Sequence, residues 1–143
     1  MDDTQPADRP PSNDLVGIGT AARRFGLAES ALRYWEQRGL LRPAQRRSRW
    51  RLYGRNELHR IGLIQLWRET GLMNLDEIRT VLSARNHEWR QAVLGRLDEI
   101  EQQQARLTAA KSLLEHLLTC PDANPAEECP YLRAMTDERA IVR

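Results

Sequence analysis

The sequence predicts a mainly α fold, in which a winged helix-turn-helix module is followed by one long coiled-coil helix. Three observations predict it. Two short amphipathic segments are each ended by a glycine, an arginine-rich strip with aromatic residues follows them, and apolar residues later repeat at heptad spacing. The 143 residues, 41% of them hydrophobic, are enough for one modest core and an extension. No apolar run approaches the roughly 18–20 residues that span a membrane, so no membrane partner is expected.

The net charge of +2 hides an uneven distribution along the chain. Residues 17–72 contain 12 basic and 4 acidic side chains, a local net charge of +8. The chain from Met73 onward contains 9 basic and 12 acidic side chains. This division favours a polyanionic partner for the first part only.

The first two helices are predicted from apolar spacing and from their glycine ends. Gly17–Phe25 places apolar residues at steps of three and four, and Gly26 ends it. Leu27–Arg38 follows, with Trp35 as an inward anchor, and ends before a second glycine. Two short helices joined by a glycine turn form a helix-turn-helix unit.

A β-wing is predicted next, because Pro43 blocks continuation of the helix. Arg46–Tyr53 would form two strands with a turn near Arg47-Ser48-Arg49. The surrounding strip, Arg42–Arg55, contains six arginines, two aromatic residues and no acidic residue. That composition suits contact with a phosphate backbone.

Two further helices should complete the module. Asn56 is a plausible N-cap for a helix over Glu57–Thr70, and Asn74 for a helix over Leu75–Ala84. The apolar residues expected to face inward from the first of these are Leu58, Ile61, Ile64, Leu66 and Trp67.

A long helix is predicted from His87 to Thr119, a segment without proline. Its apolar residues fall on one heptad seam if two polar residues, Gln104 and Lys111, fill the gaps. A stripe this long cannot be buried on a module of about 70 residues, so an antiparallel pair of helices in a homodimer fits best. The alternative is a helix that folds back on its own domain. The apolar seam residues are Val93, Leu97, Ile100, Leu107, Leu114 and Leu118.

The tail begins with Cys120 and a proline-punctuated loop that ends at Cys129. Tyr131–Ala134 should add a short helical turn, and the remainder should be frayed. The N-terminal residues are acidic and lack the apolar core of a signal peptide, so we expect a cytoplasmic protein. In that compartment two cysteines are expected to be reduced, metal-bound or redox-active rather than a structural disulfide.

These elements divide the chain into four predicted parts. We expect a disordered arm over residues 1–14 and a winged helix-turn-helix DNA-binding domain over residues 15–84. A dimerisation helix should occupy residues 86–119, and an effector loop and tail residues 120–143.

The order of these elements resembles that of MerR-family transcription regulators, over roughly Val16 to Tyr131. The strongest match is the block from Ala31 to Leu41, Ala-Leu-Arg-Tyr-Trp-Glu-Gln-Arg-Gly-Leu-Leu, and a second is the Arg-x-Tyr strand that ends at Tyr53. The chain departs from the family pattern in two places. Arg49 stands where the wing turn usually has glycine, and Trp35 replaces the commoner second tyrosine.

The resemblance implies a homodimer that binds promoter DNA and is not an enzyme. Such a dimer would bend and untwist an overlong promoter spacer so that RNA polymerase can engage it. The second helix would enter the major groove, with the wing on phosphates beside it. Arg33 alternatively contacts only the backbone, and Tyr34 alternatively packs. The predicted DNA contacts are Thr20, Ser30, Arg33, Tyr34, Arg46, Arg47, Arg49, Arg51 and Tyr53.

The resemblance also implies a metal effector, because the family's thiophilic-metal sensors carry a similar cysteine pair after the dimer helix. Cys120 and Cys129 would bind a soft or borderline ion, namely Cu(I), Zn(II), Cd(II) or Hg(II). The chain has no third cysteine, which leaves a two-thiolate site for Cu(I) or Hg(II), or a zinc site completed by His116, His87 or Glu128.

Two other uses of the cysteines stay open. Arg85 lies where three-thiolate sensors of the family have cysteine, and a guanidinium from the partner would favour the thiolate of Cys120. The pair would then act as a dithiol–disulfide switch or as a sensor of electrophiles. Alternatively, both cysteines merely pack, and the protein is an effector-independent DNA-binding or architectural protein. No catalytic constellation stands out in the sequence.

Overall fold

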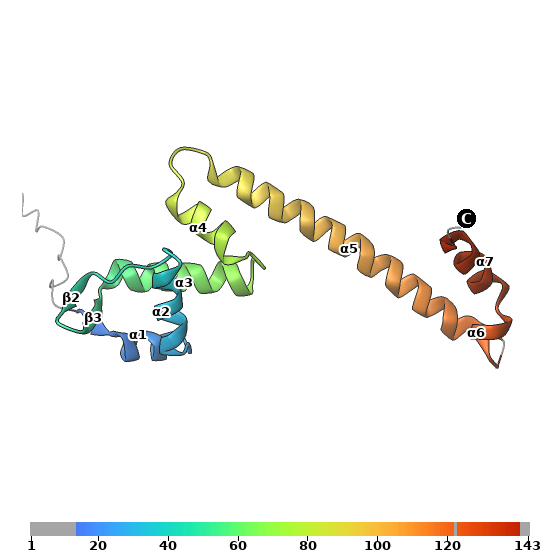
Figure 1. Ribbon diagram of the computed structural model, residues 1–143, viewed down its shortest axis with the longest axis horizontal. Helices are drawn as coiled ribbons and strands as arrows, with labels where there is room; N and C mark the ends of the chain where they lie inside the picture. The colour runs from blue at the N-terminus through green and yellow to red at the C-terminus, as the bar shows by residue number, and fades with distance from the viewer. Residues whose placement is uncertain (1–13, 122, 141–143) are drawn as a thin grey trace, which may run out of the picture. The chain divides into compact units, whose positions relative to one another are not determined.

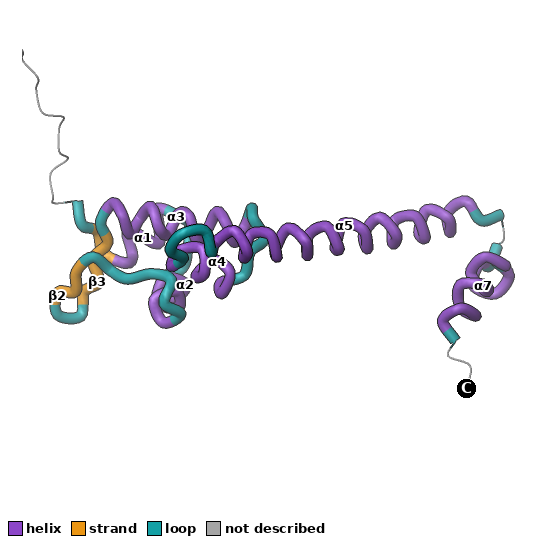
Figure 2. Tube along the Cα trace, turned by 90° about the horizontal axis from the view of Figure 1, so that it is seen from above, coloured by secondary structure: helices purple, strands orange, loops and turns teal. Residues whose placement is uncertain are grey.

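The computed structural model describes residues 14–121 and 123–140. Figures 1 and 2 show a mainly helical chain with one small sheet and a long helix, as the sequence predicts. The chain divides into two compact units between Arg96 and Leu97, so the first residues of the long helix belong with the N-terminal unit. The predicted disordered arm lies outside the described residues except for Asp14, which is exposed.

The helix-turn-helix is confirmed, with ends shifted by one or two residues. Helix α1 spans Ile18–Arg24 and α2 spans Glu29–Gln37. Gly26 and Gly39 follow these helices with φ of 65° and 74°. This left-handed backbone is strained for a residue with a Cβ atom, which is why glycine ends both helices.

The wing is also confirmed, and it belongs to a three-stranded antiparallel sheet. Strand β2 spans Gln45–Arg47 and β3 spans Trp50–Tyr53. Arg47 pairs with Trp50, which leaves a two-residue turn whose left-handed position is Ser48, with φ of 56°. The turn therefore tolerates an arginine at position 49, because the positive φ falls one residue earlier, at Ser48.

The third strand was not predicted. Strand β1, Val16–Gly17, pairs antiparallel with the free edge of β3, and the sheet order is β1-β3-β2. Two residues are too few to show the alternation of apolar and polar side chains that identifies a strand in a sequence.

Helix α3 spans Arg55–Glu69, and the prediction that Asn56 is its N-cap is wrong. Gly54 is the N-cap, because its N–H donates at 2.9 Å to the carboxylate of Glu57, three residues later. The cap of α4, Leu75–Ser83, is as predicted. The N–H of Glu77 donates to Oδ1 of Asn74 at 2.9 Å, and the N–H of Asn74 donates back to Glu77 at the same distance.

The core of the N-terminal unit is formed by residues of helices α1 to α4 and by Tyr53 of the sheet. Trp35 is almost fully buried, and its indole Nε1 has no hydrogen-bond partner among the described residues. The prediction that Leu66 faces inward is wrong, since 52% of it is exposed. Leu66 follows the buried Ile64 by two residues, which places it on the opposite side of the helix. The largest fully buried residues are Trp35, Tyr53, Leu32, Leu40, Ile61, Ile64 and Ile78.

Helix α5, Trp89–Thr119, has no buried residue among its 31. Its predicted seam is exposed in the single chain, with 70% of Leu107, 60% of Leu114 and 88% of Leu118 accessible. The start of the helix is held to α4 by Arg96, which donates from Nη2 to Oε1 of Glu77 at 2.7 Å and from Nε to Oε2 at 3.0 Å. None of the described helices is both long and apolar enough to cross a membrane.

The described part of the tail contains more helix than predicted. The cysteine-bounded loop contains a short helix, α6, over Pro125–Glu128, and α7 extends over Pro130–Arg139 instead of forming a single turn. Each helix begins with a proline, whose fixed φ suits the first helical position.

We predict that Asn74→Ala lowers the free energy of unfolding by about 1 kcal/mol, because it removes the side-chain acceptor that caps α4. The matched control is Asn56→Ala, an exposed position within the first turn of α3. It should change stability by less than about 0.5 kcal/mol. Urea denaturation followed by circular dichroism measures both. Equal losses in the two variants would contradict the assignment of caps.

Candidate nucleic-acid interface and thiol site

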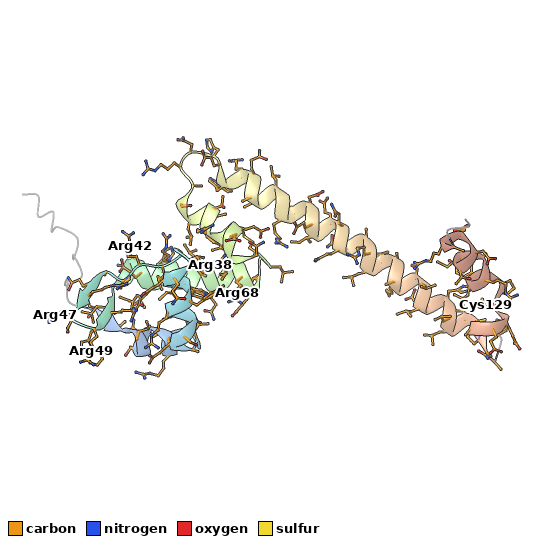
Figure 3. All side chains as sticks on the ribbon, viewed as in Figure 1. Arg38, Arg42, Arg47, Arg49, Arg68 and Cys129 are labelled. Carbon is orange, nitrogen blue, oxygen red and sulfur yellow. The ribbon has the colours of Figure 1, made fainter. Side chains whose placement is uncertain are left out.

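Four predicted DNA-contacting residues, with Arg51 of β3 among them, line one hollow on the N-terminal unit. Thr20 reaches it from α1, Arg33 from α2 and Arg49 from the wing turn, and the hollow encloses about 360 Å³. Figure 3 shows Arg47 and Arg49 at the outer end of the wing. The fold thus gathers hydroxyl and guanidinium donors from separate elements onto one surface, which suits contact with a phosphate chain.

Trp50 lines the same hollow, and 70% of its surface is exposed. Sequence reasoning noted this aromatic residue within the arginine strip but did not include it among the site residues. The spacing along β3 could have identified it. Trp50 and Tyr53 are three residues apart, so they point to opposite faces of the strand, and if one is buried the other is exposed.

The exposed face of α2 carries the predicted base-contacting residues. Ser30 is exposed, and 45% of Tyr34 is accessible. Arg33 donates from Nη2 to Glu29 at 3.1 Å, an exposed pair that is easily exchanged for another acceptor. The guanidinium of Arg38 lies 5.9 Å from the centre of the Tyr34 ring. These side chains are therefore available on the surface, as contact with a major groove requires.

Glu36, about one turn after Arg33 on α2, is contacted by side chains from both wing strands. Its Oε1 accepts from the hydroxyl of Tyr53 at 2.6 Å, and its Oε2 accepts from Nε of Arg51 at 2.8 Å. Nη2 of Arg46 lies 3.5 Å from the same Oε2. Only 8% of the Glu36 side chain is exposed. Sequence reasoning missed this residue, because a glutamate in a helix gives no signal of its partner.

The prediction that Tyr53 contacts phosphate is wrong for this structure. Tyr53 is fully buried, and its hydroxyl is used by Glu36. Burial, together with the hydrogen bond to the Glu36 carboxylate, raises the pKa of Tyr53 above its ordinary value, so the hydroxyl stays protonated and donates. Arg51 is partly exposed, but its Nε is engaged in the same cluster. The side chains of Arg46, Arg47 and Arg49 remain largely exposed.

The C-terminal unit brings His116 and the cysteines together. The Sγ of Cys129 lies 3.8 Å from Nε2 of His116, and only 5% of Cys129 is exposed. The His116 ring lies 4.2 Å, between centroids, from the ring of Tyr131. Cys120 is partly exposed. The predicted third ligand thus lies beside Cys129, the more distant cysteine in sequence.

Several donors face the sulfur of Cys129. Its pKa is lowered, chiefly by a hydrogen bond from the backbone N–H of Leu132, then by His116, against the opposing effect of burial. Tyr131 and Cys120 contribute in the same direction. A thiolate is the form that binds metal and that acts as a nucleophile. Among the described residues, however, no three histidine, cysteine or acidic side chains are grouped so that they form a ready-made metal centre.

The N-terminal unit defines a class of protein. A helix-turn-helix whose second helix and wing share a basic hollow belongs to a DNA-binding regulator. Comparison with known families agrees. Residues 17–85 match the model of the MerR HTH family regulatory protein, and residues 58–117 match the model described as MerR, DNA binding. The chain therefore belongs to the MerR family of transcription regulators, which are not enzymes.

Relatives extend over most of the chain. It is 29% identical to the HTH-type transcriptional regulator HmrR of Rhizobium leguminosarum bv. viciae, over 85% of this chain and 98% of that one. It is 29% identical to heavy metal-dependent transcription regulator 1 of Rhizobium meliloti (strain 1021), over 85% and 88%. Among solved structures, the regulator PbrR691 from Ralstonia metallidurans CH34, in complex with lead(II), matches with a TM-score of 0.62 and 27% identity, over 82% and 97%.

We predict that Arg49→Ala weakens binding to any DNA duplex and lowers the slope of log affinity against log salt concentration by about 0.9, the value for one phosphate contact. The matched control is Arg68→Ala, in the last turn of α3 and away from the wing in Figure 3. This control should leave affinity and slope unchanged. Fluorescence anisotropy over a range of salt concentrations measures both. An unchanged slope for Arg49→Ala would remove this residue from the interface.

Proposed function

We propose that the protein is a homodimeric regulator that binds a promoter through α2 and the wing and alters transcription when a thiophilic metal ion binds at Cys120 and Cys129. The observation that carries the DNA-binding part is the hollow shared by Thr20, Arg33 and Arg49. These residues come from three separate elements. A surface with no ligand would not require donors from three elements to lie together.

In this proposal α2 occupies the major groove. Arg33 suits paired hydrogen bonds to guanine O6 and N7, while Ser30 and Tyr34 lie on the same exposed face. Thr20, near the start of α1, donates to phosphate, and Arg46, Arg47 and Arg49 hold the backbone beside the groove. Arg51 contributes mainly through its pair with Glu36.

The dimer is supported by the uncovered seam of α5. The apolar residues Leu107, Leu114 and Leu118 are all more than half exposed in the single chain. A second copy that supplies the same stripe would bury both, and an antiparallel arrangement lets one seam complement itself. Lys111 and Gln104 interrupt the seam and would fix its register at some cost in stability.

Two observations support a metal effector: the thiol chemistry of the tail, and the metal-responsive proteins among the relatives. Two thiolates select soft ions, so Cu(I) or Hg(II) needs only Cys120 and Cys129, while Zn(II) or Cd(II) would need further ligands. His116, 3.8 Å from Cys129, is the nearest candidate. The relatives include regulators named as heavy metal-dependent and a structure with lead(II).

Transcription would be controlled through the shape of the promoter. A dimer whose wings and recognition helices hold two half-sites can bend and untwist an overlong spacer when the effector binds, so that RNA polymerase can engage both promoter elements. The protein would act in the cytoplasm, where the thiols stay reduced.

The second candidate is a thiol sensor of oxidants or electrophiles, favoured by the donors around Cys129. Its lowered pKa and its contact with His116 suit a reactive thiolate, and Cys120 contributes to the lowering of that pKa. Such a sensor would use the same DNA-binding surface. An effector-independent architectural protein would instead bind DNA without preference for sequence.

We predict that anaerobically purified protein binds one Cu(I) or Hg(II) per site and that the double variant Cys120→Ser/Cys129→Ser does not, because no other thiolate is available. Metal content, measured by mass spectrometry, and metal-dependent transcription in vitro should be lost together, while operator binding is retained. His116→Ala separates the two kinds of metal site, since it should weaken Zn(II) but not Cu(I). Absence of any stoichiometric metal and of metal-dependent transcription would reject the metal effector.

We predict that Leu107→Asp raises the dissociation constant of the dimer by about 100-fold, because a charge replaces an apolar seam residue. The control is Ala109→Asp, which adds the same charge two residues further on, on the opposite face of α5. Sedimentation equilibrium measures both. A monomeric wild-type protein, or equal effects of the two variants, would contradict the proposed seam.

A further inference from the structure

The Glu36 cluster carries an inference beyond the contacts that DNA itself would make. We infer that Glu36 is a positioning residue that fixes the wing to α2, and that this fixed relation allows the protein to discriminate its operator from other DNA. The inference rests on the proposed function, because it assigns a role within that DNA-binding surface.

The contacts join elements that are distant in sequence. Glu36 lies near the end of α2, Arg46 lies on β2, and Arg51 and Tyr53 lie on β3. Tyr53 and Arg51 reach different oxygens of one carboxylate, at 2.6 and 2.8 Å, so the wing is held at two points rather than one. The side chain of Glu36 is 8% exposed, which protects these contacts from competition by water and salt.

The wing needs such an attachment. Strands β2 and β3 have three and four residues, and a short two-stranded hairpin is marginally stable by itself. On its free edge β3 pairs only with the two residues of β1. The carboxylate of Glu36 therefore adds two hydrogen bonds to the packing of Tyr53 in the core, and together they restrain the wing relative to the recognition helix.

That restraint matters for specificity because phosphate contacts position a protein on the duplex, while base contacts read the sequence. Arg33 and Tyr34 precede Glu36 by three and two residues on the same helix, and Arg47 and Arg49 lie on the wing that Glu36 holds. If the wing moves relative to α2, phosphates can still be bound, but the base-contacting residues lose their register.

The charge of Glu36 makes a distinctive prediction. The carboxylate offsets positive charge of Arg51 and Arg46, so Glu36→Gln adds one unit of positive charge beside the DNA-facing hollow while it weakens the attachment. Added positive charge raises the affinity for any DNA duplex. A loose wing lowers the affinity for the operator only, because only the operator requires the base contacts to be in register. General damage to the fold would instead lower both affinities together.

The experiment uses the full-length protein and two duplexes. One is an operator selected by the wild-type protein from a random 30-base-pair library, and the other is a duplex of scrambled sequence. For Glu36→Gln we predict an operator affinity at least about tenfold lower, with affinity for the scrambled duplex unchanged or higher, so the ratio of the two falls by about tenfold or more. Fluorescence anisotropy at several salt concentrations measures both.

Two matched variants complete the design. Glu69→Gln changes the charge by the same amount within the same unit, at an exposed carboxylate at the end of α3 that does not line the hollow and accepts from Gln65. It should raise both affinities and leave their ratio within about threefold. Tyr53→Phe removes one donor to Glu36 without a change of charge, and it should lower the ratio while the salt slope stays constant.

The outcomes are separable. If the wild-type protein selects no operator, the proposed function fails and this inference fails with it. If an operator is selected but Glu36→Gln retains the wild-type ratio, the inference alone is overturned. Should Glu36→Gln prove unfolded by circular dichroism, Tyr53→Phe decides, and a wild-type ratio in that variant overturns the inference.

Discussion

In the proposed function, the arrangement of the DNA-binding surface depends on one nearly buried carboxylate. Glu36 accepts hydrogen bonds from Tyr53 and Arg51, and through them a small sheet is attached to the second helix of the helix-turn-helix. The Tyr53 ring also packs in the core beside residues of α2, and the two hydrogen bonds add a polar attachment to that packing. Donors from three elements line a single hollow on this unit, and in the proposed function the Glu36 contacts would fix the spacing between base contacts and phosphate contacts.

The opposite end of the chain has different chemistry. There the apolar stripe of α5 gives way to two thiols, one of which is nearly buried against His116. The local charge also changes sign, from basic before Leu72 to acidic after Met73. This division suits the proposed function, in which the basic part would bind DNA and the thiol-bearing part would bind a soft cation. The exposed seam of α5 supplies a reason for two copies to act together.

Much of the fold was predictable because its signals are local. Glycines that end helices, the Asn74 cap and the heptad stripe each depend on a few neighbouring residues. The wrong predictions concern places where two local patterns compete or where the pattern is too short to recognise. Asn56 resembles a cap, but Glu57 lies three residues after Gly54 and satisfies that N–H instead. Strand β1 is too short to show a pattern. Leu66 is apolar, but its position around α3 turns it away from the core.

The candidate site was harder to predict, because it depends on which way each side chain points. An Arg-x-Tyr strand has the same sequence whether tyrosine faces DNA or the core, and only the structure shows that Tyr53 is buried on Glu36. His116 lies four residues before Cys120, yet its contact is with Cys129, since the intervening chain folds back through α6. The most direct test of this account is a double-mutant cycle between Glu36 and Arg51, read as the free energy of operator binding. It predicts a coupling energy of about 1 kcal/mol or more. Additive effects of the two single substitutions would contradict it.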